Sequence, residues 1–211
     1  MRTEALIRAM AADTARGRPP GPTLAVAVLG LAAAAAAVFL PFLGTRPDLG
    51  PALMRAAVMV KQAAPLLLAV GGFGAALRLA RPGEGVGGWA VALVAVPLML
   101  AAAAATTMAA LPRADWHAAM MGSSNGQCLF WIVAMGLPLL AGTLWALRAG
   151  ASTRPALTGA AGGLLAGGAA AAVYSLHCTE DNPIFYAVWY VLAILGVALV
   201  GAVVGARVLR W

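Results

Sequence analysis

Charged residues are scarce in this chain of 211 residues: Asp, Glu, Lys and Arg make up 10%, where roughly 25% is usual for a soluble domain. Apolar residues fill the difference, since 63% of the chain is hydrophobic and the mean hydropathy is +0.90. A soluble domain of this size has too much surface for its volume to hide so many apolar side chains. Intrinsic disorder is also excluded, because disordered chains have low hydrophobicity. The composition predicts an integral membrane protein.

Six stretches of the chain are long and apolar enough to cross a membrane, because a spanning helix needs about 20 mostly apolar residues. The runs are too long for strands and lack the alternation of an outer-membrane barrel. The sequence therefore predicts an all-α integral membrane protein, with a leader over residues 1–22 and one six-span domain over residues 23–211. The expected transmembrane helices are residues 23–43, 61–77, 88–111, 128–147, 156–174 and 185–206.

Basic residues are distributed unequally between the two ends of these spans. An even number of spans places both termini on one side, which holds ten of the 14 Lys and Arg residues. The other side holds only Arg46, Arg55, Lys61 and Arg113. Since cytoplasmic loops carry the excess of basic residues, the N- and C-termini are predicted to be cytoplasmic. The basic residues form no patch for direct nucleic-acid binding, and their expected partner is the anionic leaflet of the lipid bilayer.

The middle of every expected span contains no Asp, Glu, Lys, Arg or His. Ionisable residues at that depth mark proton or ion pathways, so their absence argues against a proton-coupled pump or an ion carrier. A small membrane permease or metal exporter is kept as the alternative function. Lys61 lies about one turn inside the end of the second span, so we expect its ammonium group to reach the membrane surface. Thr106 and Thr107 are expected to bond to carbonyls of their own helix.

Small residues recur at every fourth position in the fifth span, at Gly159, Gly163 and Gly167. This spacing lets two helix backbones approach closely. We expect a tightly packed central helix, and a dedicated dimer face is the less favoured alternative. The oligomeric state is left open by the sequence.

Cys128 and Cys178 are the only cysteines, and the predicted topology places both at the non-cytoplasmic ends of spans. In an oxidising compartment they are candidates for a disulfide, which requires Cα atoms about 4.4–6.8 Å apart. Two independent small apolar residues are the alternative. A redox enzyme is not favoured because the chain has no Cys-x-x-Cys motif, and no enzymatic activity is predicted.

The same end of the predicted fold carries His177, directly before Cys178, and His117. Cysteine and histidine together bind soft or borderline metal ions. Cys128, Cys178, His177 and His117 are therefore candidate ligands for a transient metal ion, although adjacent residues are awkward as two ligands of one tetrahedral site. Solvated loop residues are the alternative interpretation of the histidines, and no resident cofactor is expected.

The leader is expected to form a short helix that begins at Thr3, which can cap it, and runs to about Asp13. Leu6, Ile7 and Met10 then share one face of this helix. Residues 16–22, rich in Pro, Gly and Arg, are expected to break the helix before the membrane. The leader suits the membrane surface or a groove on a partner protein, and a tail that only sets the topology is an equal alternative.

Several segments spread over nearly the whole chain form a recognisable set, and residues 174–183, which read YSLHCTEDNP, are the most specific. The others are Thr3, Leu6-Ile7 and Ala12-Asp13 in the leader, residues 46–49 and 78–83, Pro138 in the span after Cys128, Trp189-Tyr190 and residues 209–211. With these segments the chain resembles the NrsF-type negative regulators of extracytoplasmic-function sigma factors. These are six-span proteins of the bacterial inner membrane.

The resemblance implies an anti-sigma factor that sequesters an extracytoplasmic-function sigma factor at the cytoplasmic face. It implies that Cys128 and Cys178 face outward and sense a thiol-reactive, redox or metal stress that releases the sigma factor. It also makes the leader the simplest contact with the sigma factor, through residues Thr3, Leu6, Ile7, Met10 and Asp13. The identity of the sigma factor and of the inducing signal is left open.

Overall fold

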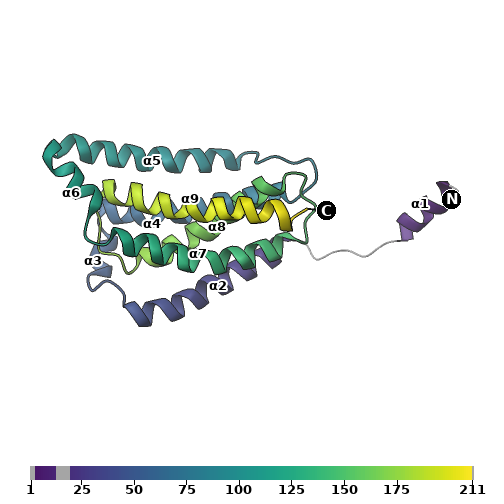
Figure 1. Ribbon diagram of the computed structural model, residues 1–211, viewed down its shortest axis with the longest axis horizontal. Coiled ribbons are helices and arrows are strands. Elements are labelled where there is room, and N and C mark those ends of the chain that lie inside the picture. The colour runs from purple at the N-terminus through teal and green to yellow at the C-terminus, as the bar shows by residue number, and fades with distance from the viewer. Residues whose placement is uncertain (1–2, 13–19, 211) are drawn as a thin grey trace.

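The computed structural model describes residues 3–12 and 20–210, and within these residues the secondary structure is helical (Figure 1). The long helices alternate with short connections, as expected for spans separated by segments rich in Pro, Gly and charge. The α-helices are α1 (Thr3–Ala12), α2 (Pro20–Leu43), α3 (Leu49–Leu53), α4 (Ala56–Leu79), α5 (Trp89–Ala110), α6 (Trp116–Met121), α7 (Asn125–Leu147), α8 (Pro155–Ser175) and α9 (Pro183–Val208), and a 3₁₀ turn (Arg113–Asp115) precedes α6.

The predicted all-α fold with six membrane-spanning lengths is confirmed, because six helices are long and apolar enough to cross a membrane. Most helix ends lie within three residues of the expected ones, and the start of α4 differs most. Helix α4 begins at Ala56 rather than at residue 61, so that Lys61 lies inside the helix. Helix α2 begins at Pro20 rather than at residue 23, because proline has no N–H to satisfy and is tolerated in a first helical turn.

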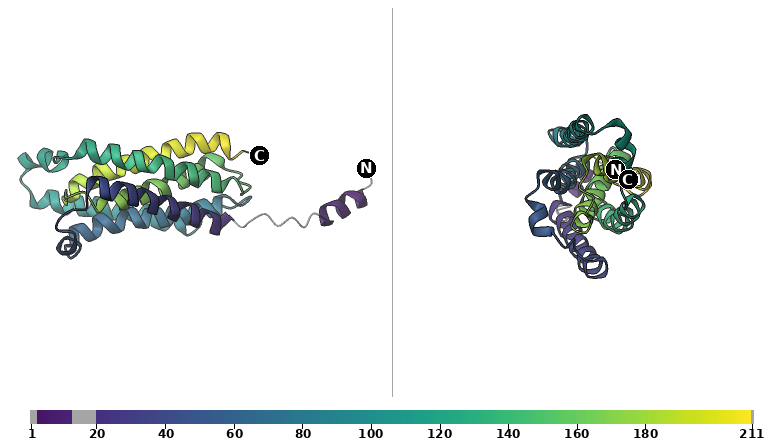
Figure 2. Two further views of the ribbon diagram at one scale, coloured as in Figure 1. Left: turned by 90° about the horizontal axis from the view of Figure 1, so that it is seen from below. Right: turned by 90° about the vertical axis from the view of Figure 1, so that its left-hand side faces the viewer.

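Helix α8 lies at the centre of the bundle and is the most deeply buried of the long helices. It packs against α9, α4 and α7, and these four helices form the core (Figure 2). Helices α2 and α5 lie at the periphery, α2 against α7 and the edge of α8, and α5 against α4 and α9. Helix α1 lies apart from the bundle beyond the start of α2 (Figure 1).

Glycine makes the close approach of α8 and α9 possible, as its spacing in the sequence predicts. A Cβ atom added at Gly163 would lie 2.5 Å from the Cα of Ala198 and 2.7 Å from the carbonyl oxygen of Val197. Gly159 faces Gly201 and Gly205, and Gly167 faces the backbone of Ile194. The stripe therefore packs within one chain, which is the predicted central-helix arrangement.

Hydroxyl groups inside α5 are satisfied by their own helix. Thr106 and Thr107 both donate to the carbonyl oxygen of Ala103, at 3.0 and 2.9 Å. This confirms the prediction that these hydroxyls bond locally, as threonine commonly does within an apolar helix.

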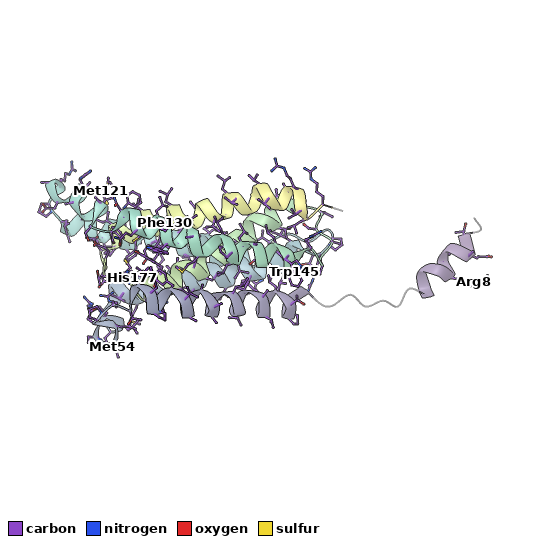
Figure 3. The ribbon with its side chains drawn as sticks, turned by 60° about the horizontal axis from the view of Figure 1, so that its bottom comes forward. Arg8, Met54, Met121, Phe130, Trp145 and His177 are labelled. Atoms are coloured by element: carbon purple, nitrogen blue, oxygen red, sulfur yellow. The ribbon has the colours of Figure 1, made fainter. Side chains whose placement is uncertain are left out.

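The two ends of the bundle differ in their chemistry. One end holds Cys128 and Cys178 together with the connections after α2, α5 and α8, and we call it the cysteine end. The opposite end, which we call the terminal end, holds the beginning of α2 and the end of α9 (Figure 1). In Figure 3, His177, Met54 and Met121 mark the cysteine end and Trp145 lies toward the terminal end.

The glycine contact between α8 and α9 leads to a prediction. Gly163→Ala should lower the free energy of unfolding by about 1–3 kcal/mol, the usual cost of an added methyl group in a packed interior, because the facing backbone of α9 must move away. Gly196→Ala is the matched control on α9, since nothing lies within 4 Å of an added Cβ there. Thermal unfolding in detergent micelles measures both, and equal stability of the two variants would contradict the prediction.

Candidate functional site

The two cysteines meet at the cysteine end, although 50 residues separate them in the sequence. Cys128 lies in the first turn of α7 and Cys178 in the connection between α8 and α9. Both are free thiols and buried, and their Sγ atoms lie 3.9 Å apart. This distance allows a weak hydrogen bond between the thiols, so the structure brings the two predicted site residues into direct contact.

Helix α8 positions Cys178 through its final turn. The backbone N–H of Cys178 donates to the carbonyl oxygen of Tyr174 at 3.1 Å, which folds the chain back as the helix ends. On the other side of the pair, the Oγ of Ser124 lies 3.7 Å from the Sγ of Cys128. Cys128 is therefore positioned by α7, and Cys178 is positioned by the last turn of α8. Ser124, Cys128 and Cys178 follow one another at contact distances of 3.7 and 3.9 Å.

Lys61 has more partners than the sequence analysis gives it. Its side chain is almost fully buried within the bundle, with 1% exposed. The Nζ donates to the carbonyl oxygen of Cys178 at 2.6 Å and to Oδ1 of Asp181 at 3.4 Å. The physical reason is that the connection after α8 folds over the first turns of α4 and supplies acceptors, which offset the cost of burying a charge.

Arg46, in the connection after α2, is the second buried cation. Its guanidinium donates to both carboxylate oxygens of Asp181, at 2.7 and 2.8 Å, and to both oxygens of Asp48, at 2.8 and 3.2 Å. A further, longer bond reaches the carbonyl oxygen of Cys178 at 3.4 Å. Paired planar contacts of this kind are the strong form of an arginine–carboxylate interaction, so Arg46 ties the end of α2 to the Cys178 segment.

Arg55 completes the network, with its Nη2 at 2.5 Å from Asp48 and 3.3 Å from Asp181. Three cations thus share two carboxylates. Asp181 is the common partner of all three, because Arg46, Arg55 and Lys61 all lie within ion-pair distance of it. An unpaired buried cation is strongly unfavourable, so Asp181 is the anion on which the arrangement of this end depends.

The charges change the acidity of the groups outside the helices. The hydrogen bonds that Arg46 donates to Asp181 and Asp48 raise the pKa of Arg46 above its ordinary value. Burial acts to raise the pKa of Asp181, but the hydrogen bond from Arg46 and the charges of Lys61 and Arg46 outweigh it and lower that pKa. The pKa of Cys178 lies below the ordinary thiol value, because Cys128 can donate to its sulfur and the charge of Lys61 is close, although burial opposes the shift.

His177 joins the same segment to α2 on the other side. Its Nδ1 lies 2.8 Å from the carbonyl oxygen of Gly44 and donates to it. Beside this bond, the backbone N–H of Arg46 donates to the carbonyl oxygen of Leu176 at 3.0 Å. The connection after α2 and the segment that carries Cys178 are therefore joined by backbone, imidazole and guanidinium contacts.

The four residues that the sequence analysis gives as candidate metal ligands do not lie together in one site. The two cysteines are in contact, but His177 is engaged with Gly44, and His117 lies exposed on α6. Within residues 3–12 and 20–210, no group of three or more His, Cys, Asp or Glu side chains is placed to hold a metal ion.

An open polar cavity of about 440 Å³ lies beside the thiols at the cysteine end. Cys178 is one of its lining residues, whereas Cys128 is not. Its remaining lining comes from the end of α2, the start of α7 and the last turn of α8 with its connection: Leu43, Thr45, Arg46, Pro47, Ser123, Ser124, Gln127, Tyr174, His177 and Thr179. The cavity therefore gives one of the two thiols a route to the surface of the bundle.

The charged shell of the thiols is what sequence reasoning missed. A signal for Lys61 was present, because an ionisable residue within an expected span marks a functional site by default. Arg46 and Asp181 lie in two of the segments that carry the family resemblance, residues 46–49 and 174–183, but nothing in the sequence assigned them a contact with the thiols. Their role depends on the folding back of two connections that are far apart in the sequence.

The leader residues expected to contact a sigma factor lie on or beside α1. Thr3 and Ile7 are exposed on this helix. The side chains of Leu6 and Met10, and Asp13 as a whole, lie outside the described part of the chain. The structure thus confirms a leader helix without testing the partner contact.

Comparison with known proteins gives a consistent result over the full chain. Residues 9–211 match the family described as NrsF, negative regulator of sigma F. The chain is 42% identical to the anti-sigma-F factor NrsF of Caulobacter vibrioides (strain NA1000 / CB15N) and 38% identical to the probable anti-sigma-F factor NrsF of Azospira oryzae (strain ATCC BAA-33 / DSM 13638 / PS), with 100% of each chain covered in both cases. No solved structure matches the chain.

The shared anion predicts how stability depends on Asp181. Asp181→Asn should lower the free energy of unfolding near pH 7 by about 2–3 kcal/mol, because it weakens the compensation of two buried cations. The folded-state pKa of Asp181 is lowered, so its contribution is complete above the ordinary value of 3.8 and is lost as the pH falls through the folded-state value. The difference between the variant and the wild type should therefore shrink in acid.

Thermal unfolding in detergent micelles between pH 7 and pH 3 measures this effect. Asp115→Asn, which changes an exposed carboxylate at the same end, is the control and should leave stability unchanged. If the difference in stability between Asp181→Asn and the wild type did not change with pH, the negative charge of Asp181 would not be the source of its stabilising effect.

Proposed function

Because the chain belongs to the NrsF family of negative regulators of sigma F, we propose that it is an anti-sigma factor that holds an extracytoplasmic-function sigma factor inactive at the membrane. The observation that carries the proposal is the identity of 42% to an anti-sigma-F factor over the whole length of both chains. The six helices of membrane-spanning length fit a regulator that keeps its partner at a membrane surface.

The orientation that we propose places the terminal end in the cytoplasm of a bacterium and the cysteine end outside its inner membrane. Arg148, Arg154, Arg207 and Arg210 are all exposed at the terminal end, as the excess of basic residues in cytoplasmic segments requires. A sigma factor acts in the cytoplasm, so the exposed helix α1, which precedes α2 at this end, is the surface that we assign to it.

The thiol pair is the element to which we assign stress sensing. Two free thiols at 3.9 Å can be joined with little rearrangement, and a disulfide would bring the sulfurs to about 2.05 Å. In this step a two-electron oxidant takes two electrons, the thiols lose two protons, and one S–S bond forms. The segment that carries Cys178 would then pull on α7 and, through Arg46 and His177, on the end of α2.

The end of α2 gives this movement a route across the membrane. Helix α2 follows the leader in the chain and ends at Leu43, directly before the residues that contact His177 and Leu176. It packs at the edge of the bundle, and packed helices shift between discrete arrangements rather than deform continuously. We assign to α2 the coupling of the thiols to the leader.

Serine replacements test the sensor. In cells that carry a reporter for the sigma factor, Cys128→Ser and Cys178→Ser should each keep the reporter repressed and abolish its induction by the thiol oxidant diamide, because neither variant can form the disulfide. Ser152→Ala, at the terminal end, is the control and should behave as the wild type. Normal induction in both cysteine variants would refute the assignment.

The leader is tested by placing a charge on its apolar face. Ile7→Asp should free the sigma factor and raise reporter activity in unstressed cells by about tenfold, which corresponds to a loss of roughly 1.4 kcal/mol of binding. Ala5→Asp adds the same charge on the other side of the helix and is the matched control. Immunoblots of membranes establish equal protein levels, and equal repression by both variants would place the contact elsewhere.

Co-purification distinguishes the proposed function from the alternative of a small permease or metal exporter. A sigma factor that remains bound to the wild-type protein in mild detergent supports the regulator, and its loss from Ile7→Asp identifies the leader as the contact. Substrate flux in proteoliposomes without any bound sigma factor would support the transporter instead.

A further inference from the structure

The two thiols of the pair differ in their access to the outside of the bundle. Cys178 lines the open polar cavity of about 440 Å³, and Cys128 does not. Cys128 has no exposed surface, and its sulfur lies 3.9 Å from that of Cys178. A molecule in the cavity therefore lies against Cys178 and not against Cys128.

The two thiols also differ in the charges around them. The Nζ of Lys61 and the Nη1 of Arg46 both donate to the carbonyl oxygen of Cys178, at 2.6 and 3.4 Å. The neighbour of Cys128 on its other side is the hydroxyl of Ser124, which is neutral. A cation stabilises a thiolate, which is the nucleophilic form of cysteine, so the cationic side of the pair is the side of Cys178.

We propose that Cys178 is the thiol that reacts first, that Cys128 is the thiol that resolves the mixed disulfide, and that the polar cavity admits a small, water-soluble disulfide. This inference rests on the proposed use of the thiol pair as a sensor. It adds to it an order of reaction, an entry site and a chemical class of reactant.

The chemistry with a small disulfide is a two-step exchange. The thiolate of Cys178, having released its proton to solvent in the cavity, attacks one sulfur of the reactant, whose S–S bond breaks and releases one thiolate. Cys128 then loses its proton and attacks the sulfur of Cys178, and the second half of the reactant leaves as a thiolate. The reactant disulfide is reduced to two thiols, and the two cysteines are oxidised to one disulfide.

Lys61 is the positioning residue for this order of reaction. It fixes the backbone of Cys178 through the carbonyl oxygen and places a buried positive charge against this residue. The pKa of Cys178 is lowered in part by this charge. The other titratable or charged groups around Cys178 are Cys128 from α7, Tyr174 from α8, Tyr190 from α9, Arg46 after α2, and Glu180 and Asp181 from its own connection.

These other groups do not replace Lys61, which lies farther from Asp181, at 3.4 Å, than Arg46 does, at 2.7 Å. Arg46 is saturated by Asp48 and Asp181, and Glu180 accepts from the backbone and hydroxyl of Ser123, away from Lys61. Asp181 is shared among three cations. Lys61 and Arg46 carry two positive charges, and Glu180 and Asp181 carry two negative ones. The effect of Lys61 on Cys178 therefore comes from the closeness of its ammonium group, which binds the carbonyl oxygen of Cys178 at 2.6 Å.

The order of reaction is tested on the purified full-length chain in detergent. With limiting iodoacetamide at pH 7, peptide mass spectrometry should find Cys178 alkylated about tenfold faster than Cys128, which corresponds to about one unit of difference in pKa. With 2-hydroxyethyl disulfide, Cys128→Ser should accumulate a mixed disulfide at Cys178, whereas Cys178→Ser should form none at Cys128. Equal rates or the reverse order would overturn the proposal.

The role of Lys61 is tested by its charge. Lys61→Gln should slow alkylation of Cys178 about tenfold at pH 7, and the rates should converge above the ordinary thiol pKa of about 8.5, where every accessible thiol is ionised. Lys61→Arg keeps the charge and should restore most of the rate at pH 7. Arg113→Gln removes another cation of the cysteine end, which lies near Trp116, and should change nothing.

The outcomes separate this proposal from the sensor function. A loss of rate in Lys61→Gln that is the same at every pH indicates a merely structural effect and overturns the role of Lys61. If Cys128 reacts first while both serine variants still abolish induction of the reporter, only the order of reaction is wrong. If the order holds but both serine variants induce normally, the reaction at Cys178 stands and the sensor function is wrong.

Discussion

The sharing of one carboxylate, Asp181, among three cations is the interaction on which the cysteine end depends. Two of those cations, Arg46 and Lys61, are buried and lie far from Asp181 in the sequence. Burial of a charge is tolerated only with close partners, so the segment that carries Asp181 must fold back over the bundle. Cys178 belongs to this segment, and its position against Cys128 follows from the same constraint.

The bundle behind this end is built for close and fixed packing. Helix α8 meets α9 through glycines, with backbone against backbone, and it also contacts α4 and α7. The peripheral helix α2 is different, because most of its surface is not covered by other helices. A rigid centre beside a loosely held edge helix suits a regulator in which one element moves and the remainder keeps its shape.

Several contacts link the segment that carries Cys178 to the end of α2. Gly44 and Arg46, at the end of α2, contact the segment of residues 176–181 through the imidazole of His177, a backbone bond and the pair with Asp181. A chemical change at Cys178 therefore acts on the end of the same helix whose beginning follows the leader. This path supports the proposed control of a partner at the terminal end by events at the cysteine end.

The sequence alone determined the class of fold, because six long apolar runs can bury their backbone polar groups in a membrane only as helices. It also determined the packing role of Gly159, Gly163 and Gly167 and, through the segment of residues 174–183, the family. It did not determine the surroundings of the thiols. Lys61 looked like a residue at a membrane surface, since hydropathy patterns describe a helix by itself and not the segments that fold over it. Only the tertiary structure decided that Lys61 is buried against Cys178, because ion pairs between distant segments depend on where the connections fold.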